Sequence, residues 1–519
     1  MTATARRVAQ LTQLHEDRAT RVVVDEQPVL LVRQGDTVHA LSADCPHAGA
    51  PLEEGALCNG HIVCPWHKGT FEITTGNVLE PPALAGLDRY PVTVENGEVM
   101  VTPEKIARHD SAENLADKPE FLVIGAGAAG AAACAALRMS GFAGKLTLLG
   151  DEDHEPYDRT ALSKFVPSGE MPPNDVWPLM PAEWYVQQQI ERINATVTEL
   201  DVPAKAVRLA DGRTLCYDTA LLASGSHARM PPLPGHDLKG VHVLHNLRDA
   251  IGLCDAVESG KPVAVIGSSF IGLEVAAALR KRGNPVTVIA PEAIPFEKQF
   301  GEQFGTRIKQ LHESNGVVFH LNEKVARLTG ETAVQEVALE SGKRVAASVV
   351  LIGVGVSPAT GFIKGLPLQK DGGVLVNAGM QAAPCLYAAG DIAAFPLHEN
   401  EEPLRIEHWR VAQQHAFIAA QNMCGARHRY AAVPYFWTYH YGKRFEYLGH
   451  ASGWDDVLID GDLASLKFLA LYVKAGVTVA VLACEREAAT ARLIEAMPAG
   501  LSPDEALRLA KAAEAALVD

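Results

Sequence analysis

The stretch that decides the fold is Phe121-Leu122-Val123-Ile124-Gly125-Ala126-Gly127-Ala128-Ala129-Gly130, an apolar run that ends in a G-x-G-x-x-G turn. An alanine-rich segment follows it to Gly141, and a second apolar run, Leu146–Leu149, comes just before Asp151. This order predicts a strand, a tight turn, a helix and a second strand. Such glycines let the backbone approach a pyrophosphate at the helix N-terminus, and an acid about 20 residues further on binds a ribose hydroxyl. We therefore expect a bound dinucleotide, with a plain buried Ala/Gly-rich helix as the alternative, and the expected contacts are Gly125, Gly127, Gly130 and Asp151.

A second unit with the same order starts at Val263–Ile266 and continues through Gly267-Ser268-Ser269-Phe270-Ile271-Gly272. The pattern predicts a helix over Leu273–Arg282 and a strand over Pro285–Ala290. Ser269 replaces the middle glycine, and the acid, Glu292, comes two residues after the strand. Residues 290–296 contain no Arg or Lys to bind a 2′-phosphate, so NADH is favoured over NADPH. The expected nicotinamide-cofactor contacts are Gly267, Ser269, Gly272, Glu274 and Glu292.

Two dinucleotide units in one chain indicate one flavin and one nicotinamide cofactor. The apolar segment Tyr387-Ala388-Ala389 ends in Gly390-Asp391. It resembles the second FAD fingerprint of flavoproteins with two dinucleotide domains, which implies that Asp391 binds the ribityl chain. A strand followed by an ordinary Gly-Asp turn is the alternative.

The composition excludes several classes of protein. The chain has 519 residues, 48% of them hydrophobic and 21% charged, which is typical of a globular protein with roughly three or four domains. Its net charge of −16, without a basic cluster, argues against a nucleic-acid partner. Residues 121–137 have about the length of a membrane helix but consist mostly of Gly and Ala, so we expect no membrane span. Nine scattered cysteines and no apolar leader in residues 1–14 predict a reducing cytoplasm.

The pattern of apolar and polar segments changes along the chain. Short alternating segments and turns up to residue 104 predict an all-β module, and a polar stretch over 105–117 predicts a linker. From Glu120 apolar strands alternate with Ala-rich helices, which predicts α/β structure. We expect an FAD-binding domain over 118–235 and 357–432, with an NAD-binding domain inserted at 236–356. Residues 433–519 predict an α+β C-terminal interface domain that ends in a helix over Pro503–Leu517 with Ser502 as its N-cap.

Two short loops in the β module carry the pattern C-x-H-x16-C-x2-H, formed by Cys45, His47, Cys64 and His67. Thiolates and imidazoles are ligands for iron–sulfur clusters and also for zinc. Zinc fingers space their ligands as Cys-Cys and then His-His, whereas each loop here supplies one Cys and one His. The pattern resembles a Rieske [2Fe–2S] centre, which implies that Cys45 and Cys64 bind one iron and that His47 and His67 bind the other. A zinc site and an unligated structural site are the alternatives.

This motif departs from the high-potential Rieske proteins. Those carry an extra cysteine in each loop and a hydrogen-bonding tyrosine, where this chain has Ala50, Trp66 and Phe71. Fewer hydrogen bonds to the cluster sulfurs predict a low potential for a Rieske centre, as in Rieske-type ferredoxins. Cys58, which has no partner at ligand spacing, is interpreted as structural.

Other segments identify the branch of flavoproteins. No two cysteines have the C-x4-C or C-x2-C spacing of a redox dithiol, so the flavin electrons need another acceptor. Tyr157-Asp158-Arg159-Thr160-Ala161-Leu162-Ser163-Lys164 resembles a segment of ferredoxin reductases and apoptosis-inducing-factor proteins, in which the lysine lies at the flavin and pairs with the glutamate at Glu274. Arg405-Ile406-Glu407-His408-Trp409 resembles their E-x-W segment. By this resemblance Lys164 and Glu274 are catalytic, and FAD is held by Ala129, Asp151, Lys164, Val197, Asp391 and Trp409.

The resemblance covers nearly the whole chain and is to the apoptosis-inducing-factor-like family, in the branch with an N-terminal Rieske domain. One departure is His245-Asn246-Leu247-Arg248, where relatives have an Arg-Thr pair that contacts the flavin phosphate. The resemblance implies an FAD-dependent NAD(P)H oxidoreductase that passes electrons from NADH through FAD to its own cluster, and on to a protein acceptor such as an oxygenase. The alternatives are a redox-responsive interaction or signalling protein, and an NADH-dependent reductase of a small molecule such as nitrite or a quinone. A homodimer is a further possibility.

Overall fold

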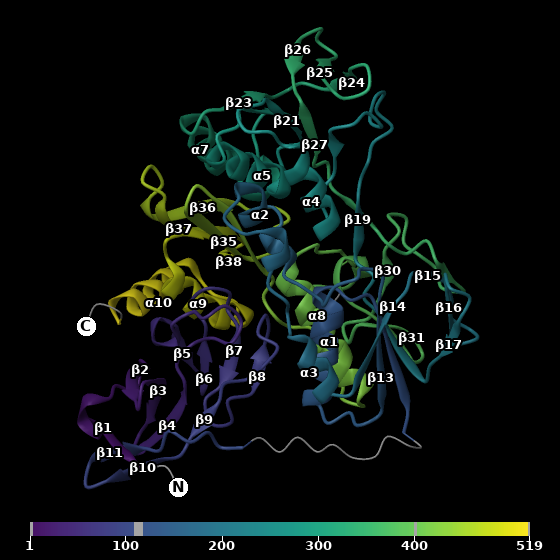
Figure 1. Ribbon diagram of the computed structural model, residues 1–519. Helices are drawn as coiled ribbons and strands as arrows, with labels where there is room; N and C mark the ends of the chain where they lie inside the picture. The colour runs from purple at the N-terminus through teal and green to yellow at the C-terminus, as the bar shows by residue number, and fades with distance from the viewer. Residues whose placement is uncertain (1–3, 108–117, 399–401, 517–519) are drawn as a thin grey trace.

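The computed structural model describes residues 4–107, 118–398 and 402–516. Most of the expected linker, 105–117, lies outside these ranges. Its first residues, 105–107, follow the β module, where Lys105 pairs with Asp88 at 2.8 Å and the Ile106 N–H donates to the Arg89 carbonyl at 2.8 Å. Figure 1 shows the N-terminal module beside both the C-terminal domain and the central helices, with the second dinucleotide unit at the opposite end of the molecule.

The N-terminal module consists of small antiparallel sheets, as the alternating sequence predicts. Two of them have the strand orders β2 (Thr20–Val24), β3 (Gln27–Gln34), β4 (Thr37–Ser42), β9 (Arg89–Tyr90), and β1 (Arg6–Gln10), β11 (Glu98–Val101), β10 (Val92–Glu95). The third has the order β5 (Ala56–Cys58), β6 (His61–Val63), β7 (Thr70–Glu72), β8 (Val78–Glu80). The loops that join β4 to β5 and β6 to β7 contain the Cys and His pairs.

A six-stranded sheet forms the centre of the first dinucleotide unit. Its order is β14 (Ile190–Asn194), β13 (Lys145–Gly150), β12 (Glu120–Ile124), β18 (Thr219–Leu222), β32 (Leu386–Ala388), β31 (Gln381–Ala383), and all neighbours are parallel except the last pair. Central parallel strands are covered on both faces, which explains why β12 is a continuous apolar run. The chain therefore contributes to this sheet both before and after the second unit.

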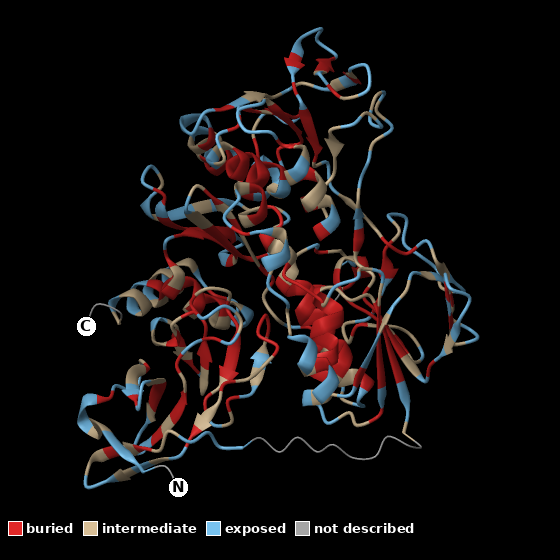
Figure 2. Ribbon diagram, in the orientation of Figure 1, coloured by how far each residue is buried: buried red, intermediate tan, exposed pale blue. Residues whose placement is uncertain are grey.

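Two helices that pack on each other, α1 (Ala128–Met139) and α8 (Trp409–Met423), cover this sheet. Figure 2 shows α1 buried along most of its length, and its alanines account for the close approach. A second sheet lies at the edge of this domain, with the order β17 (Thr214–Cys216), β16 (Ala206–Leu209), β15 (Val197–Asp201), β29 (Ile363–Lys364). Short elements complete it: α2 (Phe165–Ser168), α3 (Ala182–Gln187), β30 (Val374–Leu375) and β33 (Ala393–Ala394).

The second unit is a parallel five-stranded sheet with the order β20 (Val241–His242), β27 (Val349–Ile352), β21 (Val263–Ile266), β22 (Val286–Ile289), β23 (Val317–His320). Its helices are α4 (Leu247–Ala256), α5 (Phe270–Lys281), α6 (Glu297–Phe300) and α7 (Glu302–Ser314). A small sheet adds β24 (Val325–Thr329), β25 (Glu336–Leu339) and β26 (Arg344–Ala346). The ribbon of β19 (Ser226–Ala228) and β28 (Val356–Pro358) pairs where the chain enters and leaves the unit.

The C-terminal domain is an antiparallel sheet with two helices. Its order is β34 (Tyr435–His440), β35 (Lys443–Gly449), β38 (Val477–Cys484), β37 (Lys467–Lys474), β36 (Asp456–Asp462). The helices are α9 (Glu487–Ala496) and α10 (Pro503–Ala515), and Ser502 caps α10 by accepting from the Glu505 N–H at 3.3 Å. Within the described ranges, no helix combines the length and the apolar character that crossing a membrane requires.

Candidate functional site

The two Cys-His loops share one backbone pattern. In the first, the Cys45 N–H donates to the Ala50 carbonyl and the Gly49 N–H donates to the Cys45 carbonyl, both at 2.8 Å. In the second, the Cys64 N–H donates to the Gly69 carbonyl at 2.8 Å and the Lys68 N–H to the Cys64 carbonyl at 3.2 Å. The two loops face each other, so that the four expected ligands converge.

The four side chains meet as two pairs. The Nδ1 atoms of His47 and His67 lie 3.1 Å apart, and the buried thiols of Cys45 and Cys64 hydrogen-bond to each other. Burial opposes ionisation of Cys64, but hydrogen bonds from Cys45 and from the loop backbone outweigh it and lower its pKa to about 7. In the described part of the chain, no three His, Cys, Asp or Glu side chains surround a single-ion position. Two pairs fit a two-iron cluster, in which each iron takes two protein ligands, better than they fit zinc.

Two of the three residues that depart from the high-potential pattern are in the core of the module, and Trp66 is half-buried beside it. Phe71 is fully buried and Ala50 nearly so. Cys58 lies away from the two pairs and accepts a hydrogen bond from Arg492 at 2.7 Å, in agreement with its structural interpretation.

The first dinucleotide turn lines a cavity between β12, α1 and α8. The expected flavin contacts that line it are Gly125, Gly127, Ala129, Asp151, Asp391 and Trp409. Gly125 has φ +116°, and a Cβ there would lie 2.1 Å from the Ala223 carbonyl oxygen, so the turn requires glycine. A Cβ at Gly127 would meet nothing within 4 Å, because this residue faces the open cavity. Gly130 instead packs α1 against the turn, since its Cβ would lie 1.9 Å from the Gly125 carbonyl oxygen.

Two polar groups of this cavity can bind a flavin, and one of them has no hydrogen-bond partner. The indole Nε1 of Trp409, at the start of α8, is buried without a hydrogen-bond acceptor. Asp391 accepts from the Ser226 hydroxyl at 2.6 Å, and burial raises the pKa of its carboxyl. A buried donor and a half-buried acceptor beside a glycine turn fit a dinucleotide with ribityl hydroxyls. Val197, by contrast, begins β15 and does not line this cavity.

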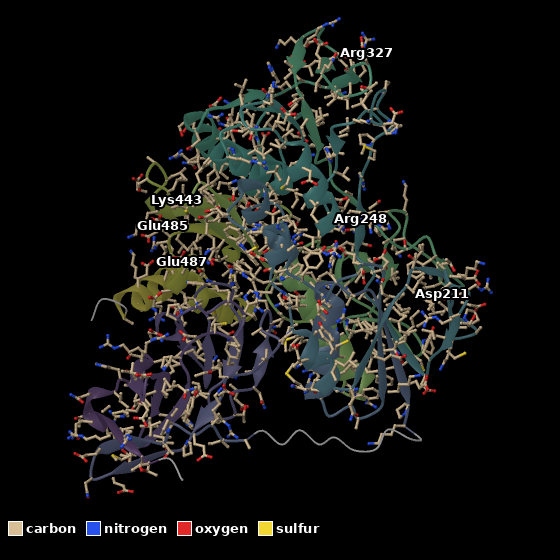
Figure 3. All side chains as sticks on the ribbon, viewed as in Figure 1. Asp211, Arg248, Arg327, Lys443, Glu485 and Glu487 are labelled. Carbon is tan, nitrogen blue, oxygen red and sulfur yellow. The ribbon has the colours of Figure 1, made fainter. Side chains whose placement is uncertain are left out.

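Of the segment that departs from the Arg-Thr pair of relatives, His245 lines the cavity and Arg248 does not. The ring of His245 lies 3.2 Å from Nη1 of Arg159 and 3.4 Å from the hydroxyl of Ser226. Burial and the Arg159 charge lower the pKa of His245 to about 4. Arg248 is exposed on α4, away from the cavity (Figure 3). The cation nearest this end of the cavity is therefore Arg159, which also pairs with Glu152.

The structure joins Lys164 to Glu274 across 110 residues of sequence. The Lys164 Nζ donates to Glu274 Oε2 at 2.9 Å, and both side chains are more than nine-tenths buried. Thr438 of β34 donates to Oε1 of the same carboxylate at 2.7 Å. Sequence reasoning missed Thr438, and no local pattern marks it.

The second dinucleotide turn has the same geometry as the first. Gly267 has φ +110°, and a Cβ there would lie 2.3 Å from the Gly353 carbonyl oxygen. Ser269, in place of a glycine, precedes α5 and donates to the Gly353 carbonyl at 3.1 Å. Gly272 packs α5 against the turn, and Glu292 is exposed beyond the end of β22. The predicted helix over Leu273–Arg282 begins earlier, because α5 spans Phe270–Lys281.

The N-terminal module is held against the flavoprotein by a buried ion pair. Lys68, next to His67, is fully buried, and its Nζ donates to Glu446 Oε1 at 2.9 Å. Tyr435 donates to the same oxygen at 2.7 Å, and Thr490 donates to Oε2 at 2.6 Å. Because both oxygens of the Glu446 carboxylate accept hydrogen bonds from protein groups, the ion pair needs no water to compensate its burial. Beside it, the His67 ring lies 4.5 Å from the ring of Trp437.

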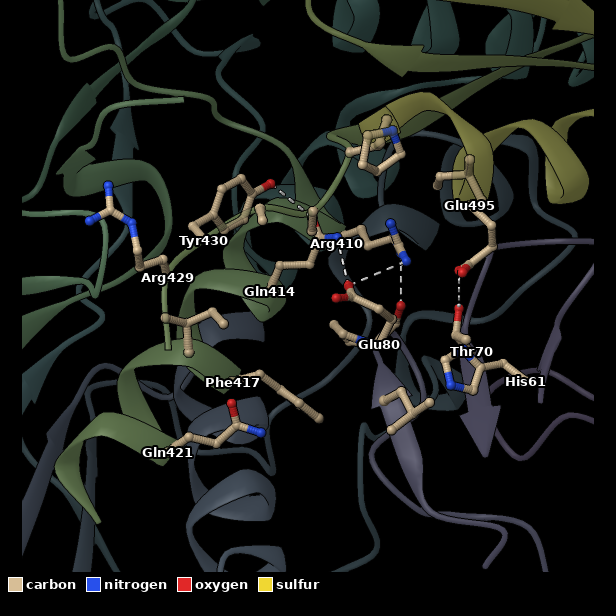
Figure 4. Close-up of a pocket in the computed structure, with 18 residues that line it drawn as sticks. His61, Thr70, Glu80, Arg410, Gln414, Phe417, Gln421, Arg429, Tyr430 and Glu495 are labelled. Carbon is tan, nitrogen blue, oxygen red and sulfur yellow. Dashed lines mark hydrogen bonds and ion pairs between the residues drawn. The ribbon is translucent and has the colours of Figure 1, made fainter. Parts of the chain in front are cut away.

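Helix α8 makes a second contact with the module (Figure 4). Arg410, one residue after Trp409, is buried and donates to the carbonyls of Pro81 at 2.8 Å and Lys68 at 2.9 Å. Gln414 donates to Glu80 at 2.8 Å. A cavity of about 430 Å³ remains at this junction. The helix whose first residue lines the flavin cavity therefore also positions the cluster loops.

Comparison with known families shows which proteins have the same domains as this chain. Residues 119–416 match the family described as Pyridine nucleotide-disulphide oxidoreductase. The chain belongs to this family. Residues 4–91 match the Rieske [2Fe-2S] domain, and residues 435–515 match the Reductase C-terminal family. The expected fold class, an all-β Rieske domain with an α/β two-dinucleotide flavoprotein and an α+β C-terminal domain, is confirmed.

Relatives extend over most of the chain. "Apoptosis-inducing factor 3" of Homo sapiens is 35% identical over 511 residues, covering 95% of this chain and 84% of that protein. The "Biphenyl dioxygenase system ferredoxin--NAD(+) reductase component" of Paraburkholderia xenovorans is 35% identical, covering 66% of this chain and 84% of that protein. A solved ferredoxin reductase of Rhodopseudomonas palustris is 29% identical with a TM-score of 0.72, covering 76% of this chain and all of that one. The family is therefore that of ferredoxin reductases and apoptosis-inducing-factor-like proteins, as the sequence indicates.

The family settles the class of activity and the cofactors. The protein is an FAD-dependent NAD(P)H oxidoreductase of the ferredoxin reductase type with a Rieske [2Fe–2S] domain. The cavities and donor sets described above fit these groups.

Proposed function

We propose that electrons pass from NADH through FAD to the chain's own Rieske cluster and then to an external one-electron acceptor protein. The observation that carries this proposal is the docked position of the module, with the His67 ring 4.5 Å from Trp437 of the C-terminal domain. The pKa of His67 lies well below its usual range because of burial and then neighbouring positive charges, one of which is Lys164. Burial lowers the pKa of His47, and the negative charge of Asp158 partly offsets this effect. Both expected cluster histidines therefore lie within electrostatic reach of the segment expected at the flavin.

We propose these residue roles on the same grounds. Bound FAD would accept a hydride from the nicotinamide and release two electrons singly, and the chain holds it, orients it and shields it from water. The proposed FAD contacts are Gly125, Gly127, Ala129, Gly130, Asp151, Lys164, Asp391 and Trp409, without Val197, which does not line the cavity. The proposed nicotinamide-cofactor contacts are Gly267, Ser269, Gly272, Glu274 and Glu292, and the proposed cluster ligands are Cys45, His47, Cys64 and His67.

We also propose the finer assignments of domain and compartment. The five-part division at 1–104, 105–117, 118–235 with 357–432, 236–356 and 433–519 is supported by the way strands group into separate sheets. None of the nine cysteines, all of which lie in the described ranges, forms a disulfide, which supports a reducing cytoplasm. NADH is the proposed donor because Glu292 lies at the end of β22, where its charge repels a 2′-phosphate. An oxygenase is the proposed class of acceptor, since relatives are named as components of dioxygenase systems.

Removing one cluster ligand tests the electron path. We expect His47→Ala to abolish the Rieske EPR signal while FAD content and NADH-driven reduction of ferricyanide remain, because the ligand lies outside the flavin cavity. Reduction of a protein acceptor such as a Rieske oxygenase should fall at least a hundredfold. His61→Ala, in the same module but outside the loops, is the matched control. Full activity with the protein acceptor in the absence of a cluster would contradict the relay.

A redox-responsive interaction protein is the second candidate, because a relative named "Apoptosis-inducing factor 3" aligns over 95% of the chain. In that case reduction by NADH would change the oligomeric state, for example to a homodimer, and turnover with protein acceptors would be slow. Sedimentation of the oxidised and the NADH-reduced protein distinguishes the two functions.

A further inference from the structure

The cavity where the N-terminal module meets the flavoprotein has no part in the proposed function. Its volume is about 430 Å³, and ligand pockets in proteins have roughly 300–1,000 Å³. Its walls come from β7 and β8 of the module, from α8, and from α9 of the C-terminal domain. Figure 4 shows Arg410 and Glu80 between Tyr430 on one side and Thr70 and Glu495 on the other. The cavity is therefore complete only while the module is docked.

The cavity has a buried floor and an exposed rim. Arg410, Phe417 and Tyr430 are buried. At the rim, Leu79 is 39% exposed and Arg429 is also exposed. The cavity is therefore open to solvent on the side of the rim, so that a small molecule can enter without undocking the module.

The floor contains a guanidinium group with an unused donor. The Arg410 Nε donates to the Pro81 carbonyl at 2.8 Å, and Nη2 donates to the Lys68 carbonyl at 2.9 Å and lies 3.6 Å from Glu80 Oε2. Nη1 is buried and has no hydrogen-bond partner. Buried donors without a partner are rare in folded proteins, because an unpaired donor costs free energy. An acceptor atom from outside the chain would supply the missing bond.

The charges around the cavity favour an anionic group over a cationic one. Glu80 accepts from Gln414 at 2.8 Å, and Glu495 accepts from a hydroxyl of β7 at 3.4 Å, so protein donors already engage both acids. Burial raises the pKa of Glu80, so this carboxyl compensates the Arg410 cation less than an ordinary carboxylate would. Arg429 adds a second cation at the rim.

The rest of the wall is apolar. Phe417 and Ile418 of α8, Val433, and Ile494 of α9 line it. Water finds few hydrogen-bond partners against such a wall, whereas an apolar molecule covers it favourably. We propose that this cavity binds a small carboxylate with an apolar body, whose carboxylate oxygen accepts a hydrogen bond from Arg410 Nη1. The inference does not depend on the proposed route of the electrons.

Binding of such a molecule stabilises the docked module. Arg410 joins α8 to the Lys68 and Pro81 carbonyls of the module, and the walls of the cavity belong to both sides of the junction. The carboxylate therefore binds the docked arrangement and not the separated parts, so it shifts the equilibrium toward docking by mass action. Thermal unfolding of the holoenzyme should move to higher temperature as the concentration of the carboxylate rises.

Isothermal titration of the holoenzyme tests the site directly. The probes are benzoate, 3-phenylpropionate and 2-naphthoate, each compared with its primary amide, which has nearly the same shape but no charge. We expect one molecule to bind per chain, and the tightest carboxylate to bind at least tenfold more tightly than its amide. The absence of saturable binding by all of these carboxylates, or equal affinities for acid and amide, would overturn the proposal.

Two variants locate the bound carboxylate. Arg410→Gln removes Nη1, and Ile418→Trp places a larger side chain in the cavity without removing the docking contacts of Arg410. Both should weaken carboxylate binding at least tenfold and abolish its effect on thermal unfolding. The matched controls are Arg327→Gln in β24 (Figure 3) and Met139→Trp at the end of α1, because both positions are exposed outside the cavity. Unchanged binding in Ile418→Trp, or an equal loss in the controls, would show that the molecule binds elsewhere.

Discussion

Asp391, a half-buried carboxylate that lines the expected flavin cavity, and Glu274, a buried carboxylate, differ in their surroundings. Glu274 pairs with the cation of Lys164 at 2.9 Å, whereas Asp391 has only the Ser226 hydroxyl, at 2.6 Å, as its side-chain hydrogen-bond partner. Burial raises the pKa of Asp391, so its carboxyl is costly to keep charged until a ligand donates to it. At the scale of single residues, Glu274 is therefore suited to balancing the Lys164 charge, and Asp391 to binding hydroxyl groups.

We expect Asp391→Ala to lose FAD. Ribityl hydroxyls would face a buried site without an acceptor, which costs about 1–3 kcal/mol of binding free energy. Isothermal titration of the apoprotein with FAD measures this loss. Asp211→Ala is the matched control, since Asp211 is exposed far from the cavity (Figure 3). Equal FAD affinities in the two variants would remove Asp391 from the site.

The sequence could predict single residues where a local pattern marks them. The four cluster ligands lie in two short segments, and Lys164 and Glu274 each belong to a recognisable motif. Thr438, His440 and His312 have no such motif. Thr438 and His440 are close in sequence, but their contacts with Glu274 and His312 join residues that are 128 or more positions away. Only the packing of α5, α7 and β34 brings them together.

At the scale of elements, the turn between β12 and α1 contains two glycines with different tasks. A Cβ at Gly125 would meet the Ala223 carbonyl oxygen at 2.1 Å, with φ +116°, whereas a Cβ at Gly127 would enter open space in the cavity. We expect Gly125→Ala to lower the free energy of unfolding by about 2 kcal/mol or more. Gly127→Ala should leave that energy nearly unchanged in the apoprotein and weaken FAD binding at least tenfold. Urea unfolding measures the stability of both variants, and FAD titration measures their affinity. Equal losses of stability and of FAD affinity in the two variants would contradict the different roles of the two glycines.

The ends of elements were less predictable than their existence. The strand, turn and helix order at both units follows from hydrophobic periodicity and glycine, which act over a few residues. The second helix starts at Phe270 rather than Leu273, because backbone geometry already turns helical within the glycine-rich segment. Val197, expected at the flavin, instead begins a strand outside the cavity, since a single apolar residue has no distinctive environment in the sequence.

At the scale of the whole molecule, a buried ion pair is central to the docking of the N-terminal module, beside the contacts that Arg410 and Gln414 of α8 make. Lys68 and Glu446 lie 378 residues apart in sequence, so their contact could not be predicted from either segment. Removing one partner leaves the other charge buried without compensation, which costs about 3–5 kcal/mol.

We expect Lys68→Met to weaken docking, so that thermal unfolding separates into two transitions and NADH-driven reduction of the cluster slows at least tenfold. Lys443→Met, which removes an exposed ion pair with Glu485 in the C-terminal domain (Figure 3), should cost less than about 1 kcal/mol. The double variant Lys68→Met/Glu446→Gln should recover part of the loss, because no uncompensated charge remains. A single thermal unfolding transition in Lys68→Met, at an unchanged temperature, would show that the other contacts are sufficient to dock the module.

The module docked through Lys68 and α8 changes the kinetic order of the reaction. In a system with a separate electron carrier, transfer depends on how often two proteins meet, so dilution slows it. Here donor and carrier are parts of one chain, in fixed one-to-one ratio and in fixed orientation. Internal transfer is then a first-order event whose rate is the same at any cellular abundance. A cell that makes few copies of this protein therefore retains the speed of this internal step in each copy, whereas transfer to the external acceptor still depends on encounter.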